Sequence, residues 1–320
     1  MIKCNILDQK YASLKIGTDC SGIEAPIEAL KKICKNHNFK YKHIFSSEID
    51  KYAIKYIKAN HNPEILYGDM KERDVKTIPD IDIYISGFPC QPFSRANKFK
   101  TKIDPRLNLF ECCVDVIKNK NPIIFILENV KTLVTLDNGS YFNEILRKLN
   151  NINQYNIHWK VINSKDYGIP QCRERLYIIG INKNFAKYEF IFPKVKPMKN
   201  INNFIDNNDN SKNEIKENNK ELFQNIPKDA IFIDVGFRKA KFPNSNKWAP
   251  CITAQPNMWC VPKNRKANIK EYLMLQGFPI DDVIQSISDH QFKIKIGNSM
   301  TVDVIEELLL SCFKNINLIK

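Results

Sequence analysis

IDIYISGFPCQPFS, at residues 81–94, is the stretch that says most about how this chain folds. Its first six residues are mostly apolar and β-branched or aromatic, which predicts a buried strand. Directly after that strand, Cys90 lies between Pro89 and Pro92, and the fixed φ angles of the two prolines stiffen the turn. Ligands of α/β proteins bind at the carboxyl ends of the strands, so the turn presents Cys90 as a candidate nucleophile. The alternative is a buried structural thiol, which is what a lone cysteine usually is.

The same pattern of a strand followed by a turn repeats on both sides of this stretch. Apolar runs that suit strands lie at 14–18, 42–47, 65–67, 123–127, 159–162 and 176–181. Amphipathic stretches that suit helices begin at Pro26, which fits a first helical turn, and continue at 52–59, 109–118, 141–150 and 302–313. Strands that alternate with helices predict an α/β fold with a parallel sheet covered on both faces.

Composition limits the classes of protein to which the chain can belong. Its 320 residues are 43% hydrophobic, enough for a packed core, and its formal net charge is +14. A basic protein suits a polyanionic partner such as nucleic acid, although a lysine-rich solvated surface gives the same balance. No apolar run of about 18 residues and no signal-peptide pattern occurs, so we expect a soluble, intracellular protein. The ten cysteines include no CxxC pair, which predicts free thiols and no metal site.

The character of the sequence changes after residue 182. Residues 200–220 are rich in Asn, Lys, Asp and Glu, which is typical of a loop or an insertion. The segment 183–264 carries 14 Lys and Arg against 8 Asp and Glu, and its strand-like runs are short. This balance favours a smaller domain that faces nucleic acid.

Three successive predicted strands end in a glycine or an acid. Gly22 follows the first strand, Glu48 the second and Asp69 the third. The sequence has no GxGxxG motif there, but a glycine lets the backbone approach a ligand, and acids at such positions can bind ribose or adenine. Each acid taken alone would more often be a helix cap. Their repetition predicts a cofactor that contains a nucleoside.

GFPCQPFS (87–94) resembles the active-site motif of the cytosine-5 methyltransferases, and the family's other motifs follow in order from about residue 14 to 313. The resemblance implies an α/β fold with a Rossmann-like, S-adenosylmethionine-dependent methyltransferase sheet and a small inserted target-recognition domain. It implies a catalytic and cofactor-binding domain at 1–182, a target-recognition domain at 183–290, and a C-terminal segment, 291–320, that returns to the catalytic domain.

The resemblance also implies S-adenosyl-L-methionine as the methyl donor. SSEIDKYA (46–53) is similar to the family's second motif, GDM (68–70) to the third and GNS (297–299) to the tenth. The residues that the resemblance assigns to the cofactor are Cys20, Ser21, Gly22, Ile23, Glu48, Ile49, Asp69, Met70, Pro89, Leu109, Asn298 and Ser299. Among them, Glu48 would bind the ribose and Asp69 the adenine amino group.

The first motif, TDCSG (18–22), departs from the family's commonest pattern. Thr18 stands where the family usually has an aspartate, Asp19 comes one place later, and Cys20 replaces the usual aromatic residue. We therefore expect a different contact with the adenine at this point.

The catalytic roles also follow from the resemblance. Cys90 would add to carbon 6 of cytosine, which makes the poorly nucleophilic carbon 5 able to attack a methyl group. Glu128, in ENV (128–130), would engage ring nitrogen 3, and Gln91 completes the loop beside the nucleophile. Arg175 would contact the cytosine carbonyl oxygen, and Arg173 would help position Glu128 and the DNA backbone. Two arginines so spaced on a strand share one face, and the alternative is a phosphate patch without a catalytic duty.

The basic loop 94–106, with Arg95, Lys98, Lys100 and Lys102, is a candidate to close over a bound strand. A duplex hides carbon 6 within the base stack, so the target base would have to be flipped out, as is general for methyltransferases that act on bases.

Several readings of the substrate stay open at this point. We expect double-stranded DNA, no membrane partner, action as a monomer and a cytoplasmic or nuclear location, with a cognate restriction endonuclease as a possible companion. A tRNA-methylating branch shares the motifs but commonly reads Pro-Pro-Cys, whereas this chain has Phe88 before Pro89. A non-catalytic DNA-binding relative would be expected to lack Cys90, Glu128 or Arg175, and all three are present.

Overall fold

The computed structural model describes residues 13–37, 39–89, 108–212, 223–224, 226–236 and 246–319. The chain divides into two compact units. The first comprises Met1–Ile162, Glu174–Pro193 and Ile305–Lys320, and the second comprises Asn163–Arg173 and Lys194–Val304.

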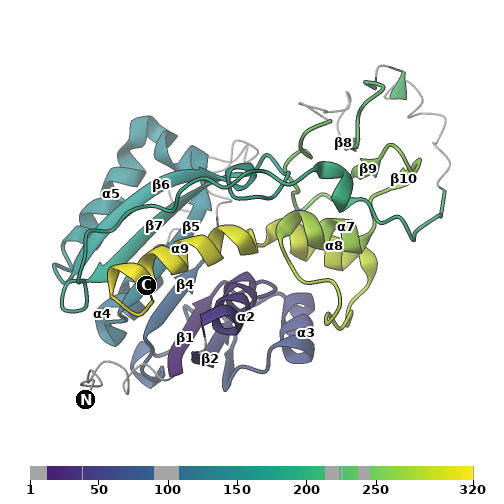
Figure 1. Ribbon diagram of the computed structural model, residues 1–320. Coiled ribbons are helices and arrows are strands. Elements are labelled where there is room, and N and C mark those ends of the chain that lie inside the picture. Colours follow the sequence, from purple (N-terminus) through teal and green to yellow (C-terminus); the bar gives the residue numbers. More distant parts are fainter. Residues whose placement is uncertain are drawn as a thin grey trace, which may run out of the picture. The chain divides into compact units, whose positions relative to one another are not determined.

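The first unit is built on a seven-stranded sheet in the order β3-β2-β1-β4-β5-β7-β6 (Figure 1). Its strands are β1 (Ser13–Asp19), β2 (Lys40–Ser47), β3 (Ile65–Tyr67), β4 (Ile83–Ser86), β5 (Ile124–Val130), β6 (Tyr155–Asn163) and β7 (Glu174–Asn182). Neighbouring strands from β3 to β5 pair in parallel. The predicted α/β fold and the predicted strand positions are confirmed.

One feature of the sheet differs from the prediction of a parallel sheet. β7 runs antiparallel to β5, with Ile124 opposite Ile181 and Val130 opposite Arg175. Only residues 164–173 link β6 to β7. A parallel crossover needs about a dozen residues or more, usually with a helix, so this link is too short for one.

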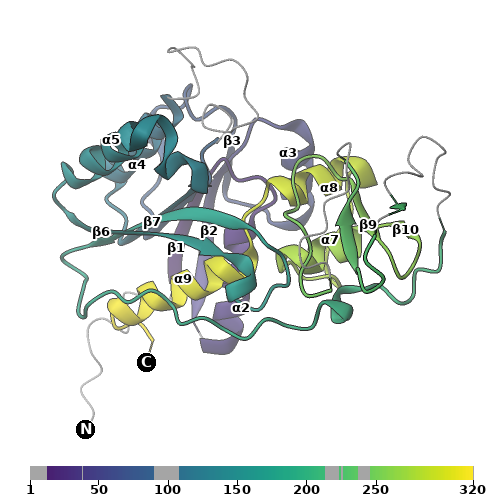
Figure 2. The same cartoon turned by 90° about the horizontal axis from the view of Figure 1, so that it is seen from above.

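Helices connect the strands and cover both faces of the sheet. They are α2 (Ala25–His37), α3 (Lys51–Asn60), α4 (Asn108–Lys120), α5 (Ser140–Asn150) and α9 (Val302–Asn315). Figure 2 shows α4 and α5 on one face and α2 with most of α9 on the other. These helices lie close to the predicted positions. Within the described residues, no helix is long and apolar enough to cross a membrane.

Local chemistry explains where these elements begin and how closely they pack. The side chain of Asp50 accepts hydrogen bonds from the N–H groups of Tyr52 and Ala53, which starts α3. Gly17 and Gly180 lie under aromatic rings: a Cβ at Gly17 would come within 2.1 Å of the Phe45 ring, and one at Gly180 within 2.0 Å of the Phe125 ring. The rings of the sheet core therefore require glycine at both positions.

The core between the sheet and the α4–α5 face is continuous. Buried side chains of β2, β4, β5 and β7 meet those of α4 and α5, and they include Phe45, Tyr84, Phe125, Leu127, Ile178, Cys113, Ile117, Phe142 and Leu149. Strands of this kind are apolar on both faces, which is why the sequence shows continuous apolar runs rather than alternation.

The second unit has a smaller, three-stranded sheet in the order β10-β9-β8. Its strands β8 (Phe232–Asp234), β9 (Met258–Cys260) and β10 (Arg265–Lys266) pair antiparallel. Two helices that the sequence did not predict follow, α7 (Ile269–Gln276) and α8 (Asp289–Asn298). Asn268 and Glu271 form a reciprocal capping box at the start of α7, and Gly277, at φ 79°, ends it.

Candidate functional site

Residues that follow β1, β2 and β3 converge because neighbouring parallel strands end at the same edge of the sheet. The N–H of Glu48, after β2, donates to the carbonyl of Tyr67 in β3 at 3.2 Å, and the Ser47 hydroxyl donates to the carbonyl of Gly68 at 2.7 Å. The turn after β1 joins this edge through Ser21, whose N–H donates to the carbonyl of Ser47 at 3.1 Å. The three strand ends therefore form one continuous hydrogen-bonded edge.

Glu48 is the most highly coordinated acid of this edge. Its Oε1 accepts from the N–H groups of Ile49 and Asp50 at 2.8 and 2.9 Å, and its Oε2 accepts from the N–H of Gly22 at 2.8 Å. A carboxylate offers about four acceptor positions, so about one remains, on Oε2. That vacancy suits a single ribose hydroxyl.

The side chain of Ile49 is 72% exposed, which is unusual for isoleucine. Gly22 has φ 57°, and a Cβ built on it would meet no atom within 4 Å. The turn thus offers open backbone beside an exposed apolar side chain, and Glu48 lies between them. This donor and acceptor set fits a nucleoside.

Asp69 and Met70 follow β3 on the same edge. Asp69 accepts from the N–H of Lys71 at 2.9 Å and lies 3.3 Å from the Lys71 ammonium. The Met70 sulfur lies 3.9 Å from Sγ of Cys20, so the first and third motifs touch here. Burial, reinforced by the neighbouring Cys113 and Asp19, raises the pKa of Cys20 well above its ordinary value. A thiol with a raised pKa stays protonated, so the Cys20 sulfur is neutral at neutral pH.

An ion pair that the sequence analysis missed supports this part of the edge. Arg73 donates from Nη1 and Nη2 to the two carboxylate oxygens of Asp19, both at 2.8 Å, and Tyr84 donates its hydroxyl to Asp19 at 2.7 Å. The Arg73 guanidinium also lies 5.0 Å from the ring centroids of Phe45 and Tyr67. Asp19 thus binds Arg73 and Tyr84 and anchors the segment after Asp69. No sequence spacing signals this pair, because 54 residues separate its members.

Of the residues predicted as catalytic, Cys90 follows β4 in the chain and Glu128 lies in β5. Cys90, Gln91 and the basic loop 94–106 fall outside the described residues. The last described residues before Cys90 are Phe88, which is buried, and Pro89, which is partly exposed. Asn129 Nδ2 donates to the carbonyl of Phe88 at 3.1 Å, and Asn129 Oδ1 accepts from the N–H of Val130 at 2.8 Å. The chain just before Cys90 is therefore fastened to the end of β5, next to Glu128.

Glu128 and Arg175 form an ion pair. Nε of Arg175 lies 3.3 Å from Oε1 of Glu128, and the two side chains are 18% and 12% exposed. Arg175 pairs with Val130 in the antiparallel β5–β7 ladder, so it is the diagonal neighbour of Glu128 on one face. The structure brings together these two residues, which the sequence predicted as catalytic.

Arg173 has different partners from Arg175. It precedes β7, belongs to the second unit, and donates from Nη1 and Nη2 to the carbonyls of Ile252 and Ser299, both at 2.7 Å. Its guanidinium is thus committed to main-chain oxygens of the second unit.

A buried amide network surrounds Arg173 in that unit. Gln171 donates to the carbonyl of Leu275 at 2.6 Å and to Oε1 of Gln276 at 2.8 Å, and accepts from the N–H of Ile252 at 2.9 Å. Gln276 donates to the carbonyl of Ser299 at 3.0 Å. Gln171 and the Ser299 carbonyl are thus held inside the second unit. The neighbouring Asn298 ends α8 with its side chain exposed.

Leu109 lies in the first turn of α4 and is buried. It packs in the core on the α4–α5 face of the sheet, near Phe88 and Met70 in the same cluster. Ser21 is buried, and Ile23 is fully buried, so both side chains are part of the packed interior next to the turn.

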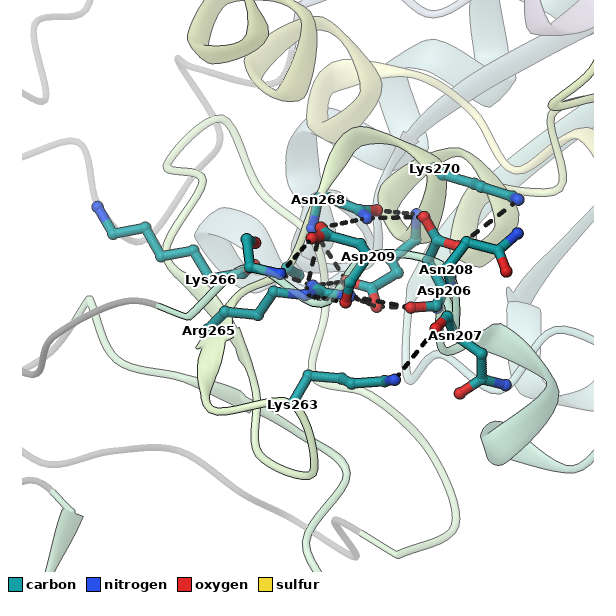
Figure 3. Close-up of polar contacts among 12 residues, drawn as sticks. Asp206, Asn207, Asn208, Asp209, Lys263, Arg265, Lys266, Asn268 and Lys270 are labelled. Carbon is teal, nitrogen blue, oxygen red and sulfur yellow. Dashed lines mark hydrogen bonds and ion pairs between the residues drawn. The ribbon is translucent and has the colours of Figure 1, made fainter.

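A charged cluster in the second unit joins the segment 206–209 to the start of α7 (Figure 3). Arg265 is 1% exposed and forms two 2.8 Å hydrogen bonds with Glu271. Asn268 donates to Asp206 at 3.0 Å and to Asp209 at 2.9 Å. Hydrogen bonds to Ser211 and Asn268 lower the pKa of Asp209 to about 2. The polar side chains of this cluster use one another as hydrogen-bond partners, so the cluster serves the structure of the unit. No group of three potential ligands for a metal ion occurs among the residues that the structure describes.

The chain is similar to proteins of known class over almost its whole length. The family described as C-5 cytosine-specific DNA methylase matches residues 19–314. The Type II methyltransferase M.HaeII of Haemophilus aegyptius is 34% identical over 317 residues, which are 97% of this chain and 95% of the relative. The Type II methyltransferase M.NgoBI of Neisseria gonorrhoeae is 34% identical over 324 residues, 94% of this chain and 93% of the relative.

Among solved structures, the Entamoeba histolytica methyltransferase EhMeth has a similar fold. The two match with a TM-score of 0.71 at 22% identity, over 96% of this chain and 99% of that one.

Proposed function

We infer the chemistry of this site from one premise: the chain belongs to the C-5 cytosine-specific DNA methylase family. It is a DNA cytosine-5 methyltransferase. Both the family and the similar Type II methyltransferases favour DNA over the tRNA alternative and over a non-catalytic relative.

We propose that S-adenosylmethionine binds at the ends of β1, β2 and β3. When bound, it supplies an electrophilic methyl group. Glu48 would accept a ribose hydroxyl on its remaining Oε2 position, and exposed Ile49 would pack on the adenine. Asp69 would accept from the adenine amino group. Gly22 would let the backbone approach the ligand closely, because its left-handed φ and open Cβ side leave room.

We also propose the other contacts that the family's motifs assign to the cofactor. The additional residues are Cys20, Ser21, Ile23, Met70, Pro89, Leu109, Asn298 and Ser299. Because Met70 lies against Cys20, their two sulfurs together provide a polarizable surface in place of an aromatic ring.

We propose that Cys90 is the nucleophile and that its thiolate adds to carbon 6 of a flipped-out cytosine. Glu128 would hold a proton or a hydrogen bond at ring nitrogen 3, and Arg175 would donate to the carbonyl oxygen of the base. Gln91 would lie beside the nucleophile, and Arg173 would hold its own segment through the carbonyls of Ile252 and Ser299.

The observation that carries this assignment is the hydrogen bond from the Asn129 side chain to the carbonyl of Phe88. It holds the residues just before Cys90 against the strand end that carries Glu128, and Glu128 is paired with Arg175 at 3.3 Å. A nucleophile, an acid and a guanidinium on adjacent strand ends suit attack on a base whose ring develops charge at nitrogen 3 and oxygen 2.

We further propose that residues 183–290 recognise a short sequence of double-stranded DNA. Support comes from the excess of basic residues in 183–264. The similar proteins are Type II methyltransferases, so a cognate restriction endonuclease is the proposed companion. We also propose that the protein acts as a monomer in the compartment that holds the DNA.

Incubation with labelled S-adenosylmethionine and either mixed-sequence duplex DNA or total tRNA tests these assignments. We expect label in DNA alone, at cytosines within one short recurring sequence. Label in tRNA alone would overturn the proposed substrate, and label scattered over all cytosines would overturn the proposed sequence recognition.

A further inference from the structure

Glu24 is a fully buried carboxylate beneath the turn that follows β1, and no role in the proposed chemistry uses it. Its φ is 61°, and the same turn holds Cys20 at φ 50° and Gly22 at φ 57°. Residues with a Cβ rarely adopt this left-handed region, and they persist there only where the surrounding structure holds them. Something must therefore fix the turn, and the contacts of Glu24 show what does.

Glu24 is tied to both neighbouring strands. The hydroxyl of Thr18, near the end of β1, donates to its Oε1 at 2.7 Å, and the hydroxyl of Ser46, near the end of β2, donates to the same oxygen at 2.5 Å. The Glu24 N–H donates to the carbonyl of Ser21 at 2.9 Å, and the Glu24 carbonyl accepts from Glu28 at 3.1 Å as α2 begins. The residue therefore joins two strand ends, the turn and the helix.

The directions of these hydrogen bonds follow from the number of protons. A hydroxyl has one proton, and Thr18 gives its proton to Glu24, so Thr18 does not donate to Ser21. The Ser21 hydroxyl has three acceptors within range: the Thr18 hydroxyl at 2.8 Å and the carbonyls of Thr18 and Ser47 at 3.1 and 3.2 Å. Ser46 likewise gives its proton to Glu24, and Nε2 of His43 lies 3.0 Å from the Ser46 hydroxyl and 3.4 Å from Oε1 of Glu24. Hydroxyls from both strand ends thus donate to one carboxylate oxygen, and Ser21 of the turn contacts one of these hydroxyls, that of Thr18.

We propose that Glu24 is a positioning residue for the cofactor turn, holding Ser21 and Gly22 where they can bind S-adenosylmethionine. This inference rests on the proposed cofactor site. The link to the proposed cofactor runs through Glu48, which accepts from the Gly22 N–H at 2.8 Å. A turn released by the loss of Glu24 would move Gly22 and withdraw one of the three donors that orient Glu48.

The ionisation of Glu24 agrees with this role. Burial by itself would raise its pKa, but the charge and hydrogen bond of His43, with His61 and the Ser46 hydroxyl, outweigh burial and hold the pKa below its ordinary value. Glu24 is therefore an acceptor only, at neutral pH. Its second oxygen, Oε2, makes no hydrogen bond to any described residue. Burying a carboxylate with one unpaired oxygen costs folding free energy that an apolar side chain would not cost. This favours a positioning role over simple packing.

The test is a calorimetric titration of S-adenosylmethionine into the full chain and four variants, each with a thermal unfolding curve. Glu24→Ala removes the acceptor. Glu24→Gln keeps the amide oxygen in the place of Oε1, so both hydroxyls keep an acceptor. Thr18→Val removes one donor to Glu24, together with the contact of that hydroxyl with Ser21, and leaves the carboxylate in place. Glu28→Gln is the matched control, because Glu28 is a buried acid one helical turn further along α2, and its side chain contacts Lys31 and His61 while only its main chain bonds to Glu24.

We expect Glu24→Ala to weaken binding by about tenfold or more, the order of one lost hydrogen bond to a charged group. Thr18→Val should shift affinity in the same direction by less, Glu24→Gln should restore most of it, and Glu28→Gln should leave it unchanged even if its unfolding temperature falls. A merely structural role would make affinity follow the unfolding temperature in all four variants, and would overturn the proposal.

Two outcomes separate this inference from the proposed function. If the wild-type chain binds S-adenosylmethionine and both Glu24→Ala and Thr18→Val bind it equally well, only the role of Glu24 is refuted. If the wild-type chain does not bind it, the cofactor site is refuted and the role of Glu24 with it. Should Glu24→Ala fail to fold, wild-type affinity in Thr18→Val would refute the role alone.

Discussion

Replacing Arg73 by methionine should cost the protein about 3–5 kcal/mol of folding free energy, the usual result of leaving a buried charge without its partner. The Asp19 side chain is 0% exposed and that of Arg73 is 4% exposed. Asp19 accepts two hydrogen bonds from Arg73 and one from Tyr84, and only the one from Tyr84 would remain. Methionine keeps an unbranched apolar side chain at the site, so the loss reports the guanidinium, with its charge and its contacts with the Phe45 and Tyr67 rings, more than a cavity. Domains are stable by only about 5–15 kcal/mol, so the change is large.

Urea unfolding measures this difference from the shift in the midpoint at constant slope. The matched control is Arg147→Met. Arg147 binds Glu144 through two 2.7 Å hydrogen bonds in the same two-pronged manner, but the side chains are 60% and 46% exposed. Water replaces a lost partner at such a site, so the midpoint should not move measurably. Equal shifts in the two variants would refute the reasoning.

A double-mutant cycle with Asp19→Asn separates the charge from the geometry. The amide is neutral, so in Asp19→Asn/Arg73→Met no uncompensated charge remains buried, and the double variant should be less destabilised than the sum of the single ones. Additive effects would mean that the two residues act independently, contrary to the bidentate contact.

Three further predictions concern the site and its surroundings. Cys90→Ala should abolish methyl transfer while the protein still binds S-adenosylmethionine, and turnover in a filter-binding assay would refute the covalent mechanism. Glu128→Gln should slow single-turnover methyl transfer far more than it weakens cofactor binding, because Glu128 faces Arg175 at 3.3 Å and not the cofactor edge; loss of binding alone would contradict its role. His61, whose pKa burial lowers from 6.5 to about 4, should make the folded state lose up to about 3 kcal/mol as the pH falls through that interval, because the unfolded chain takes up the proton first. His61→Asn should flatten the dependence of urea midpoint on pH between 6.5 and 4, and parallel curves would show that other groups cause it.

The sequence predicts the strands of the first unit well because their apolar runs are local signals. The positions of Glu48 and Asp69 were also predictable, because the fold determines where an acid directly after a strand lies. The Asp19–Arg73 pair was not, because no pattern joins residues 54 positions apart. The partners of Arg173 were equally hidden: they are main-chain carbonyls 79 and 126 residues away, and any residue type can supply a carbonyl.

The direction of β7 is the feature that the sequence could not supply and on which the catalytic side depends. β7 begins with Glu174 and Arg175, and in the antiparallel ladder Arg175 lies opposite Val130, at the carboxyl end of β5. In a parallel strand at the same place, the first residues would lie level with Ile124 instead. At about 3.3 Å per residue, the six residues between Ile124 and Val130 correspond to about 20 Å. Arg175 would then lie at the opposite edge of the sheet and could not reach Glu128, from which it is 3.3 Å away. The short link 164–173 that forces β7 to reverse is therefore also what delivers the guanidinium to the edge where the nucleophile, the acid and the cofactor are expected to meet.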